Sequence, residues 1–274
     1  MNITIQRTRL LYSVVTKRFH RVLGAVLTAF LLMLPAVLHA GEVHLAVAAN
    51  FSAPIKTIVV GFEKDTGHKA TITLGATGKF YAQIKSGAPY DVFLSADDET
   101  PARLEKEGDA VAGTRFTYAT GRLALWSAKA HFVDTRGEIL KTGNFTHIAL
   151  ASPKLAPYGA AAVETLQNLG LLTALAPKFV QGESIGQTFS FVSTGNAALG
   201  FVALSQVYED GRIKHGSAWV VPSSLHAPLQ QAAVVLTNGK GKGVANSATT
   251  AFMAYLKTDK VQAVIKSYGY EIGP

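Results

Sequence analysis

The sequence contains no cysteine, which excludes disulfides, thiolate nucleophiles and cysteine-ligated metals. Histidine is sparse, and none of the eight residues has a second histidine at the spacing of a metal-binding pair, so we expect no cation site and no cofactor. Charged residues make up only 16% of the chain. Basic residues do not form runs interleaved with aromatic residues, the pattern typical of nucleic-acid-binding surfaces. We therefore expect no nucleic-acid partner.

Acidic residues are absent from the first 40 positions, whereas five basic residues lie there: Arg7, Arg9, Lys17, Arg18 and Arg21. An apolar stretch at 23–34 follows, too short to span a membrane, and small residues end at Ala40. This pattern predicts a signal peptide at 1–40, cleaved near Ala40, and a periplasmic mature protein; an uncleaved anchor is the alternative. After cleavage 21 Lys and Arg face 18 Asp and Glu, so the net charge falls from +8 to +3.

Strand-like and helix-like segments alternate after the leader. Ile55, Ile58, Val59 and Phe62 recur at helical spacing. We expect strands at 44–49, 70–74 and 91–95, alternating with helices at 53–65, 78–86 and 100–107. This order predicts a parallel sheet in an α/β fold.

The pattern changes near Thr120, where a new set of elements begins. We expect strands at 122–126, 148–151, 198–203, 218–221 and 229–236, and helices at 160–169, 172–179, 186–193, 205–208 and 247–267. Glycine and lysine at 238–243 indicate a loop. We therefore expect one lobe from 41–120 plus 240–274, a second from 121–239, and a ligand cleft between them. A single doubly wound domain is the alternative.

Three of the strand-like segments lead directly into helix starts made of small residues, at 50–54, 75–79 and 95–98. A helix N-terminus presents free N–H groups and a partial positive charge, so it attracts anions. Asn50 offers its amide either to a ligand or to cap its helix. Ala76 offers a backbone N–H and Thr77 a hydroxyl. Converging helix starts of this kind predict a site for a small anion without a cationic side chain.

Two helix starts in the second half offer further donors. Tyr158 lies at the start of one helix and Ile185 at the start of another, and each can supply a backbone N–H. Taken alone, Ile185 is better explained by its residue type as a core position, and its role as a donor depends on its place at a helix start.

Enzyme patterns are incomplete. Lys79 follows Gly78, but the spacing of a phosphate-binding P-loop is wrong, and no G-x-S-x-G motif is present. Asp97 and Asp98 are adjacent carboxylates, a pattern that favours helix N-terminal charge balance or ion pairing over acid–base catalysis. We therefore expect no enzyme, with an exported hydrolase that uses Asp97 or Asp98 as the remote alternative.

Several of these segments together resemble the periplasmic molybdate-binding proteins of ABC transporters. The resemblance covers nearly all of the expected mature chain and rests on residues 48–51, 75–84, 87–97, 151–153, 157–159, 199–202 and 266–270. It implies a two-lobed type II periplasmic binding protein, the venus-flytrap fold, with mixed sheets flanked by helices. It also implies a monomer that captures molybdate or tungstate and delivers it to a membrane permease.

The resemblance further implies that the oxyanion is held by Asn50, Ala76, Tyr158 and Ile185, through hydroxyls and backbone N–H groups. Ala76 departs from the family, which commonly has serine there, and Thr77 is the candidate to compensate. One subgroup of the family has a tyrosine near position 203, where this chain has Ala203; Tyr158 fits the alternative arrangement. A site made only of donors suits a fully deprotonated dianion, so sulfate, or another anion such as phosphate, is the alternative ligand.

Overall fold

The computed structural model describes residues 40–237 and 246–272. The expected signal peptide, apart from Ala40, lies outside the described residues, as do the whole of the expected loop at 238–243 and the expected lobe boundary at 239–240. Within the described part of the chain, no helix is long and apolar enough to cross a membrane.

The first sheet has the strand order β2-β1-β3-β12-β4. Its strands are β1 (Glu42–Ala48), β2 (Lys69–Gly75), β3 (Val92–Leu94), β4 (Phe116–Gly121) and β12 (Leu229–Val235). The expected parallel pairing is confirmed for β1 with β2 and β3. The sheet as a whole is mixed, because β12 returns from the second half of the chain and runs antiparallel to β3 and β4. Strand β4 was not predicted.

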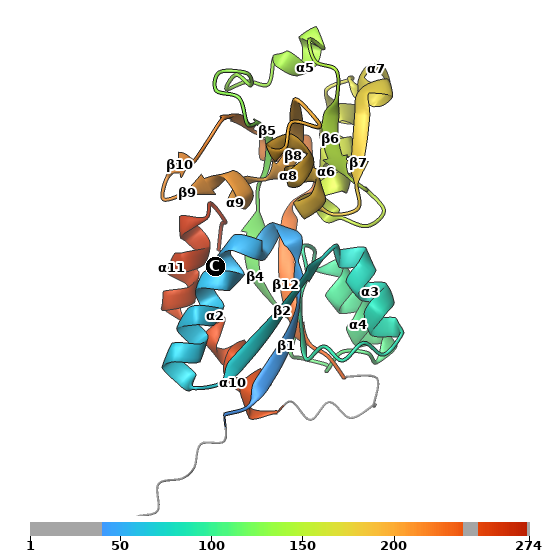
Figure 1. The fold of residues 1–274 in the computed structure, drawn as a ribbon. Helices are drawn as coiled ribbons and strands as arrows, with labels where there is room; N and C mark the ends of the chain where they lie inside the picture. Colours follow the sequence, from blue (N-terminus) through green and yellow to red (C-terminus); the bar gives the residue numbers. More distant parts are fainter. Residues whose placement is uncertain (1–39, 238–245, 273–274) are drawn as a thin grey trace, which may run out of the picture. The chain divides into compact units, whose positions relative to one another are not determined.

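Helices cover both faces of this sheet (Figure 1). Leu45 and Val47 of β1 pack in one core with α2 (Ser52–Thr66), α10 (Ser247–Tyr255) and α11 (Asp259–Ser267). Ala46 points to the opposite face, into a core with α3 (Thr77–Lys85) and α4 (Glu99–Glu107). This alternation follows from the two-residue period of a strand.

The single helix expected at 247–267 is wrong, because α10 and α11 are separate helices. The Thr258 side chain accepts a hydrogen bond from the Val261 N–H at 3.4 Å and so caps the start of α11. Threonine is a preferred N-cap residue, and a new cap here allows the chain to turn while Phe252 and Leu256 stay buried.

The second sheet has the strand order β11-β5-β8-β6-β7. Its strands are β5 (Leu123–Ser127), β6 (Ile148–Ala151), β7 (Phe179–Gly182), β8 (Leu199–Ala203) and β11 (Ser217–Val220). The helix expected at 172–179 is confirmed only for α7 (Leu172–Leu175) and a 3-10 turn at Ala176–Lys178. Pro177 cannot continue an α-helix, and the chain goes on as strand β7.

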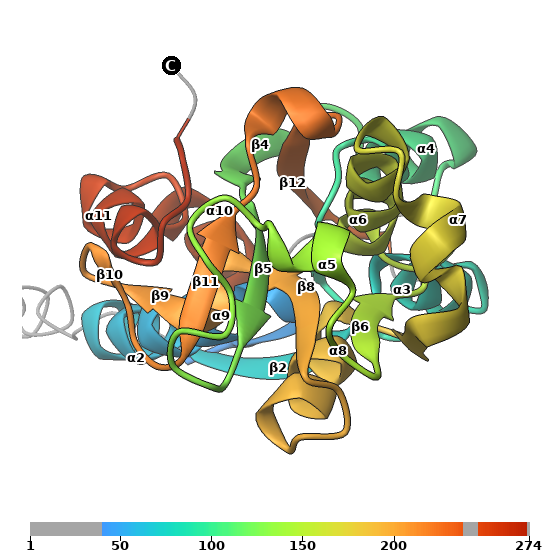
Figure 2. The same ribbon diagram turned by 90° about the horizontal axis from the view of Figure 1, so that it is seen from above.

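Helices also cover both faces of the second sheet (Figure 2). Helix α6 (Pro157–Asn168) packs on one face with Leu125 and Leu150, and α8 (Ile185–Ser193) packs on the other with Ala149 and Val202. The remaining short elements are α5 (Ile139–Thr142), α9 (Leu204–Val207), the β9–β10 hairpin (Tyr208–Glu209 and Arg212–Ile213) and 3-10 turns at Ala49–Phe51 and Ser223–Leu225.

The two sheets with their helices form the two lobes of the expected α/β binding-protein fold, which is confirmed. The exact lobe boundaries stay a prediction. Strand β12 lies within the segment 121–239, which was expected to form the second lobe, but it pairs with β3 and β4 in the first sheet.

Candidate oxyanion-binding site

The five predicted site residues line one small cavity between the two lobes. The cavity is small, with a free volume of about 10 Å³, roughly the space that one water molecule needs. Residues from both lobes line it: Ala48, Ala49, Asn50, Gly75, Ala76, Thr77, Ala96, Ala156, Pro157, Tyr158 and Ile185. None of these lining residues carries a charged side chain, so any attraction for an anion must come from backbone and neutral polar groups.

Helix starts from both lobes supply those backbone groups. Ala76 immediately precedes α3, Tyr158 lies in the first turn of α6, and Ile185 is the first residue of α8. First-turn N–H groups have no acceptor within their own helix, and the helix dipole makes this end positive. Among the described residues no side chain caps α2, α3 or α6. The Ala76 and Tyr158 N–H groups are therefore available to a ligand, whereas those of Ser52, Gly78 and Gly159 donate to backbone carbonyl oxygens.

The Thr77 hydroxyl is held at the edge of the cavity by the end of β3. Its Oγ1 accepts a hydrogen bond from the Ala96 N–H at 3.2 Å and lies 3.4 Å from the Ser95 hydroxyl. Thr77 is buried. Because these bonds use its oxygen as an acceptor, its own proton can be donated elsewhere.

The Asn50 side chain does not cap its helix; that alternative was wrong. Its Nδ2 donates to Gln231 Oε1 at 2.8 Å and to the Tyr270 hydroxyl at 3.0 Å. The Ser205 hydroxyl donates to the backbone oxygen of Asn50 at 2.7 Å. The Asn50 Oδ1 atom is buried without a hydrogen-bond partner among the described residues.

The chain is similar to known solute-binding proteins. The family described as bacterial extracellular solute-binding protein matches residues 43–271. The molybdate-binding protein ModA of Azotobacter vinelandii is 56% identical over 87% of this chain and 93% of its own. ModA of Rhodobacter capsulatus is 47% identical over 90% of this chain and 95% of its own. The chain belongs to the ModA family of bacterial extracellular solute-binding proteins.

The fold of this ModA-family chain also matches a solved structure of the same group. The periplasmic molybdate-binding protein of Azotobacter vinelandii superposes with a TM-score of 0.80 at 39% identity, over 85% of this chain and all of the other. These relatives are solute-binding proteins, which agrees with a non-enzymatic role for the family.

A buried polar network lies beneath the cavity in this ModA-family chain. Gln231 joins the lobes, because its Nε2 donates to the Tyr158 hydroxyl at 3.0 Å while its Oε1 accepts from Asn50. The Tyr118 hydroxyl lies 3.0 Å from Gln231 Oε1. Burial raises the pKa of Tyr270 to about 12 and that of Tyr118 and Tyr158 well above the usual value. The network is therefore neutral at physiological pH.

The sequence analysis missed Gln231, Tyr118 and Ser205 as supports of the site, and Tyr270 entered it only as part of a family motif. One signal was present for Gln231: it follows Gln230, and the two are the polar residues in the first part of an otherwise apolar predicted strand. The others gave no signal, because their role depends on which side chains meet in space.

Direct contacts between the lobes flank the cavity. The Gly78 N–H donates to the Leu155 carbonyl oxygen at 2.9 Å, and Lys79 forms an ion pair with Glu183. Gly186 lies so close to Ala49 that an added Cβ would be 3.2 Å from the Ala49 Cβ. The structure is therefore a state in which the two lobes are in contact around the site.

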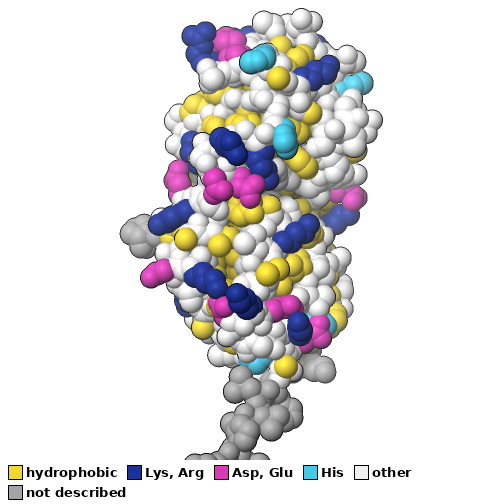
Figure 3. All heavy atoms as spheres, turned by 60° about the vertical axis from the view of Figure 1, so that its left-hand side comes forward, with side chains coloured by type: hydrophobic (Ala, Val, Ile, Leu, Met, Phe, Trp, Pro, Cys, Tyr) yellow, Lys and Arg dark blue, Asp and Glu magenta, His cyan; other side chains and the backbone are white. Residues whose placement is uncertain are grey.

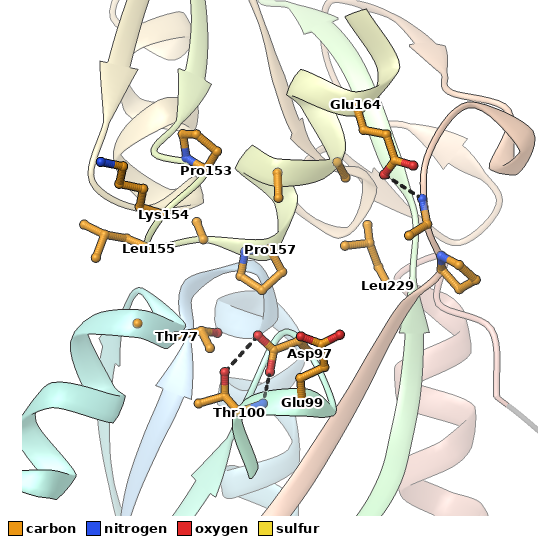
Figure 4. A pocket seen from close by; sticks show the side chains of 16 residues that line it. Thr77, Asp97, Glu99, Thr100, Pro153, Lys154, Leu155, Pro157, Glu164 and Leu229 are labelled. Atoms are coloured by element: carbon orange, nitrogen blue, oxygen red, sulfur yellow. Dashed lines mark hydrogen bonds between the residues drawn. The ribbon is translucent and has the colours of Figure 1, made fainter. Parts of the chain in front are cut away.

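A larger groove of about 320 Å³ lies beside the cavity and is drawn in Figure 4. Asp97 lines it and accepts hydrogen bonds from the Thr100 N–H at 2.9 Å and the Thr100 hydroxyl at 3.0 Å. This confirms for Asp97 the expected role at a helix N-terminus. Asp98 is not among the residues that line the groove, so the two carboxylates do not form a pair there.

We predict that Asp97→Asn stabilises the protein more at pH 7 than at pH 4. Burial raises the pKa of Asp97, so its charged form is disfavoured in the folded state, and it reduces stability as the pH rises above the ordinary aspartate range. We expect the variant's melting temperature, relative to wild type, to be higher at pH 7 by about 1–3 °C. Thermal unfolding at both pH values measures this.

The same variant also tests the site. Asp97 does not line the small cavity, so oxyanion affinity should change by less than about threefold. A large loss of affinity would contradict a site built only of donors.

Proposed function

We propose that this protein captures molybdate or tungstate in the periplasm and delivers it to the membrane permease of an ABC transporter. It acts as a binding protein, not an enzyme, and as a monomer. The names of its ModA relatives as molybdate-binding proteins support this ligand. The face in Figure 3 carries interspersed Lys, Arg, Asp and Glu side chains without a broad patch of one sign.

One observation carries the proposal: helix starts from both lobes meet at a small cavity whose lining has no charged side chain. Such a cavity offers N–H donors and positive helix ends. It offers no carboxylate to accept a proton from the ligand. A fully deprotonated tetrahedral dianion fits these donors, whereas hydrogen phosphate also needs an acceptor for its proton and finds no carboxylate in the lining.

The proposed ligand contacts follow from this placement. Ala76, Tyr158 and Ile185 donate backbone N–H groups, Thr77 donates its hydroxyl, and Asn50 contributes from the turn after β1. No resident metal cation or cofactor takes part. Because both lobes supply donors, the ligand itself draws the lobes together, as expected for a venus-flytrap protein.

The remaining assignments rest on the sequence. We propose export through the signal peptide at 1–40, with cleavage near Ala40. We also propose lobes at 41–120 plus 240–274 and at 121–239, with β12 of the second segment extending the sheet of the first.

Sulfate is the second candidate, and Ala76 motivates it. Where the family commonly has a serine, this chain offers no hydroxyl. The loss of one donor lowers the affinity for every tetrahedral dianion. It also reduces the difference in affinity between molybdate or tungstate and the smaller sulfate. Sulfate therefore belongs in every binding experiment.

Thermal unfolding of residues 41–274 with molybdate, tungstate, sulfate and phosphate in turn tests the proposal. Ligand at 100 times its dissociation constant stabilises the folded state by about 2.7 kcal/mol. For a chain of this size we expect melting to rise by about 5–10 °C with molybdate and tungstate. A rise with sulfate or phosphate alone would reassign the ligand, and no rise with any of them would contradict oxyanion capture.

A further inference from the structure

Gln231 occupies an unusual position for a polar side chain. It is fully buried on β12, and the register of β12 against β4 shifts between Gln231 and Ala232, which marks a β-bulge. Bulges redirect side chains and are common beside functional sites. The amide of Gln231 reaches both lobes, since it bonds to Asn50 and Tyr118 on one side and to Tyr158 on the other.

The hydrogen bonds of Gln231 decide the orientation of the Asn50 amide. Gln231 presents its oxygen to Asn50, so Asn50 must present its nitrogen in return. The other end of the Asn50 amide, Oδ1, is then left buried without a partner among the described residues, in a side chain that lines the cavity. A buried acceptor without a partner destabilises the folded protein.

A second hydrogen-bond pattern removes this cost. The two ends of an amide have nearly the same shape, so the surrounding bonds choose between them. If both amides turn, Gln231 donates to Asn50 and Tyr118 and accepts from Tyr158. The bonds of Gln231 are kept, because each tyrosine hydroxyl can donate or accept, and Tyr118 still donates to the Ser95 carbonyl oxygen. Tyr270 then donates to Asn50 Oδ1 instead of to the Asn50 backbone oxygen, which still accepts from Ser205. The free end of Asn50 is then an N–H, which an oxyanion can satisfy.

We propose that Gln231 is a positioning residue that sets which end of the Asn50 amide faces the ligand. This inference rests on the proposed function. With the observed pattern the cavity receives an acceptor, which opposes a dianion and favours an anion that keeps a proton. With the turned pattern it receives a donor, which suits molybdate or sulfate. Oxyanion binding and the turning of the two amides are therefore coupled.

Gln231→Glu tests the coupling. A carboxylate can only accept, so it holds Asn50 with Nδ2 inward and Oδ1 toward the cavity, and it adds a negative charge near the dianion. Protonation of the introduced glutamate removes its negative charge and gives it a proton to donate to Asn50. Burial raises the pKa of such a glutamate, so this protonation occurs more readily than in water. We expect molybdate and sulfate to bind at least about thirtyfold more weakly than wild type at pH 8.5, and within about fivefold at pH 6.

Groups that face position 231 do not obscure this pH profile. They are Tyr118, Tyr158 and Tyr270, whose pKa values are raised by burial, and Asp97, which acts on Tyr118 through its charge. All three tyrosines stay neutral over this range. Burial raises the pKa of Asp97, but wild type and the control carry the same Asp97, so its titration affects all the proteins alike. The control is Gln230→Glu, which places the same charge on the exposed face of β12. It should bind within about twofold of wild type at every pH.

Calorimetric titration of wild type, Gln231→Glu and Gln230→Glu across this pH range gives the answer. A pH-independent affinity in a folded Gln231→Glu variant overturns the inference, whereas failure of wild type to bind any oxyanion overturns the proposed function instead. Should Gln231→Glu not fold, NMR of the side-chain amides in wild type decides. The inference requires the Asn50 and Gln231 amide signals to shift together on molybdate binding, and unchanged signals overturn it.

Discussion

Replacing Ala76 with proline is expected to weaken molybdate binding by about 10- to 100-fold, because it removes a single N–H donor that faces a dianion. Hydrogen bonds to charged groups contribute more than neutral ones, and a dry cavity strengthens them further. Isothermal titration with molybdate and sulfate measures the loss. Both ligands should be affected, since the missing donor serves any tetrahedral dianion.

The local backbone makes Ala76→Pro a clean test. Ala76 has φ −85° and ψ 144°, an extended conformation close to that of proline, and it precedes the first turn of α3. Its side chain is only a methyl group, so little packing changes. Tyr158 is less suitable, because its buried ring and hydroxyl would be lost along with the N–H. We expect the melting temperature without ligand to change by no more than about 3 °C.

Ala76→Ser is the matched control at the same position. It keeps the N–H and adds the hydroxyl that the family commonly has, so affinity should stay equal or rise up to about tenfold. Wild-type affinity in Ala76→Pro would remove Ala76 from the site. Weaker binding in both variants would indicate that the position tolerates no added volume, and that the backbone N–H is not the cause.

Gly186→Leu is expected to lower oxyanion affinity by about 100-fold or more while the separate lobes stay folded. Gly186 lies in the first turn of α8, and even a Cβ there would be 3.2 Å from the Ala49 Cβ of the other lobe. A leucine side chain cannot fit between the lobes in this arrangement. It should hold them apart, so that donors from the two lobes no longer reach one ligand together.

Two measurements distinguish lobes held apart by the leucine side chain from a protein that has simply unfolded. Leucine has a higher helix propensity than glycine, so the unliganded protein should unfold at an equal or higher temperature. Small-angle scattering should show that ligand reduces the radius of gyration of wild type and leaves that of Gly186→Leu unchanged. Ser193→Leu, at an exposed position near the end of the same helix, should bind like wild type. Full affinity in Gly186→Leu would show that binding does not require this contact.

The strand-to-helix junctions were predictable because their signals are local. At each junction the small residues lie within a few positions of the strand end or helix start that they mark. This holds after β1 and β2 and at the starts of α6 and α8. The same holds for the apolar period of α2, confirmed with only small shifts at its ends. Strands β4 and β7 were missed, since their short segments mix polar and apolar residues and become strands only through their neighbours in the sheet.

The sequence by itself determined that several helix starts follow strands and that most residues around them are small. It also determined the family, through motifs spread along the chain. Only the tertiary structure decided that these helix starts line one cavity and that Asn50 faces Gln231 and Tyr270. Those partners lie 181 and 220 positions away. Helix starts depend on neighbouring residues, whereas the direction of a buried amide depends on every donor and acceptor that folding brings around it.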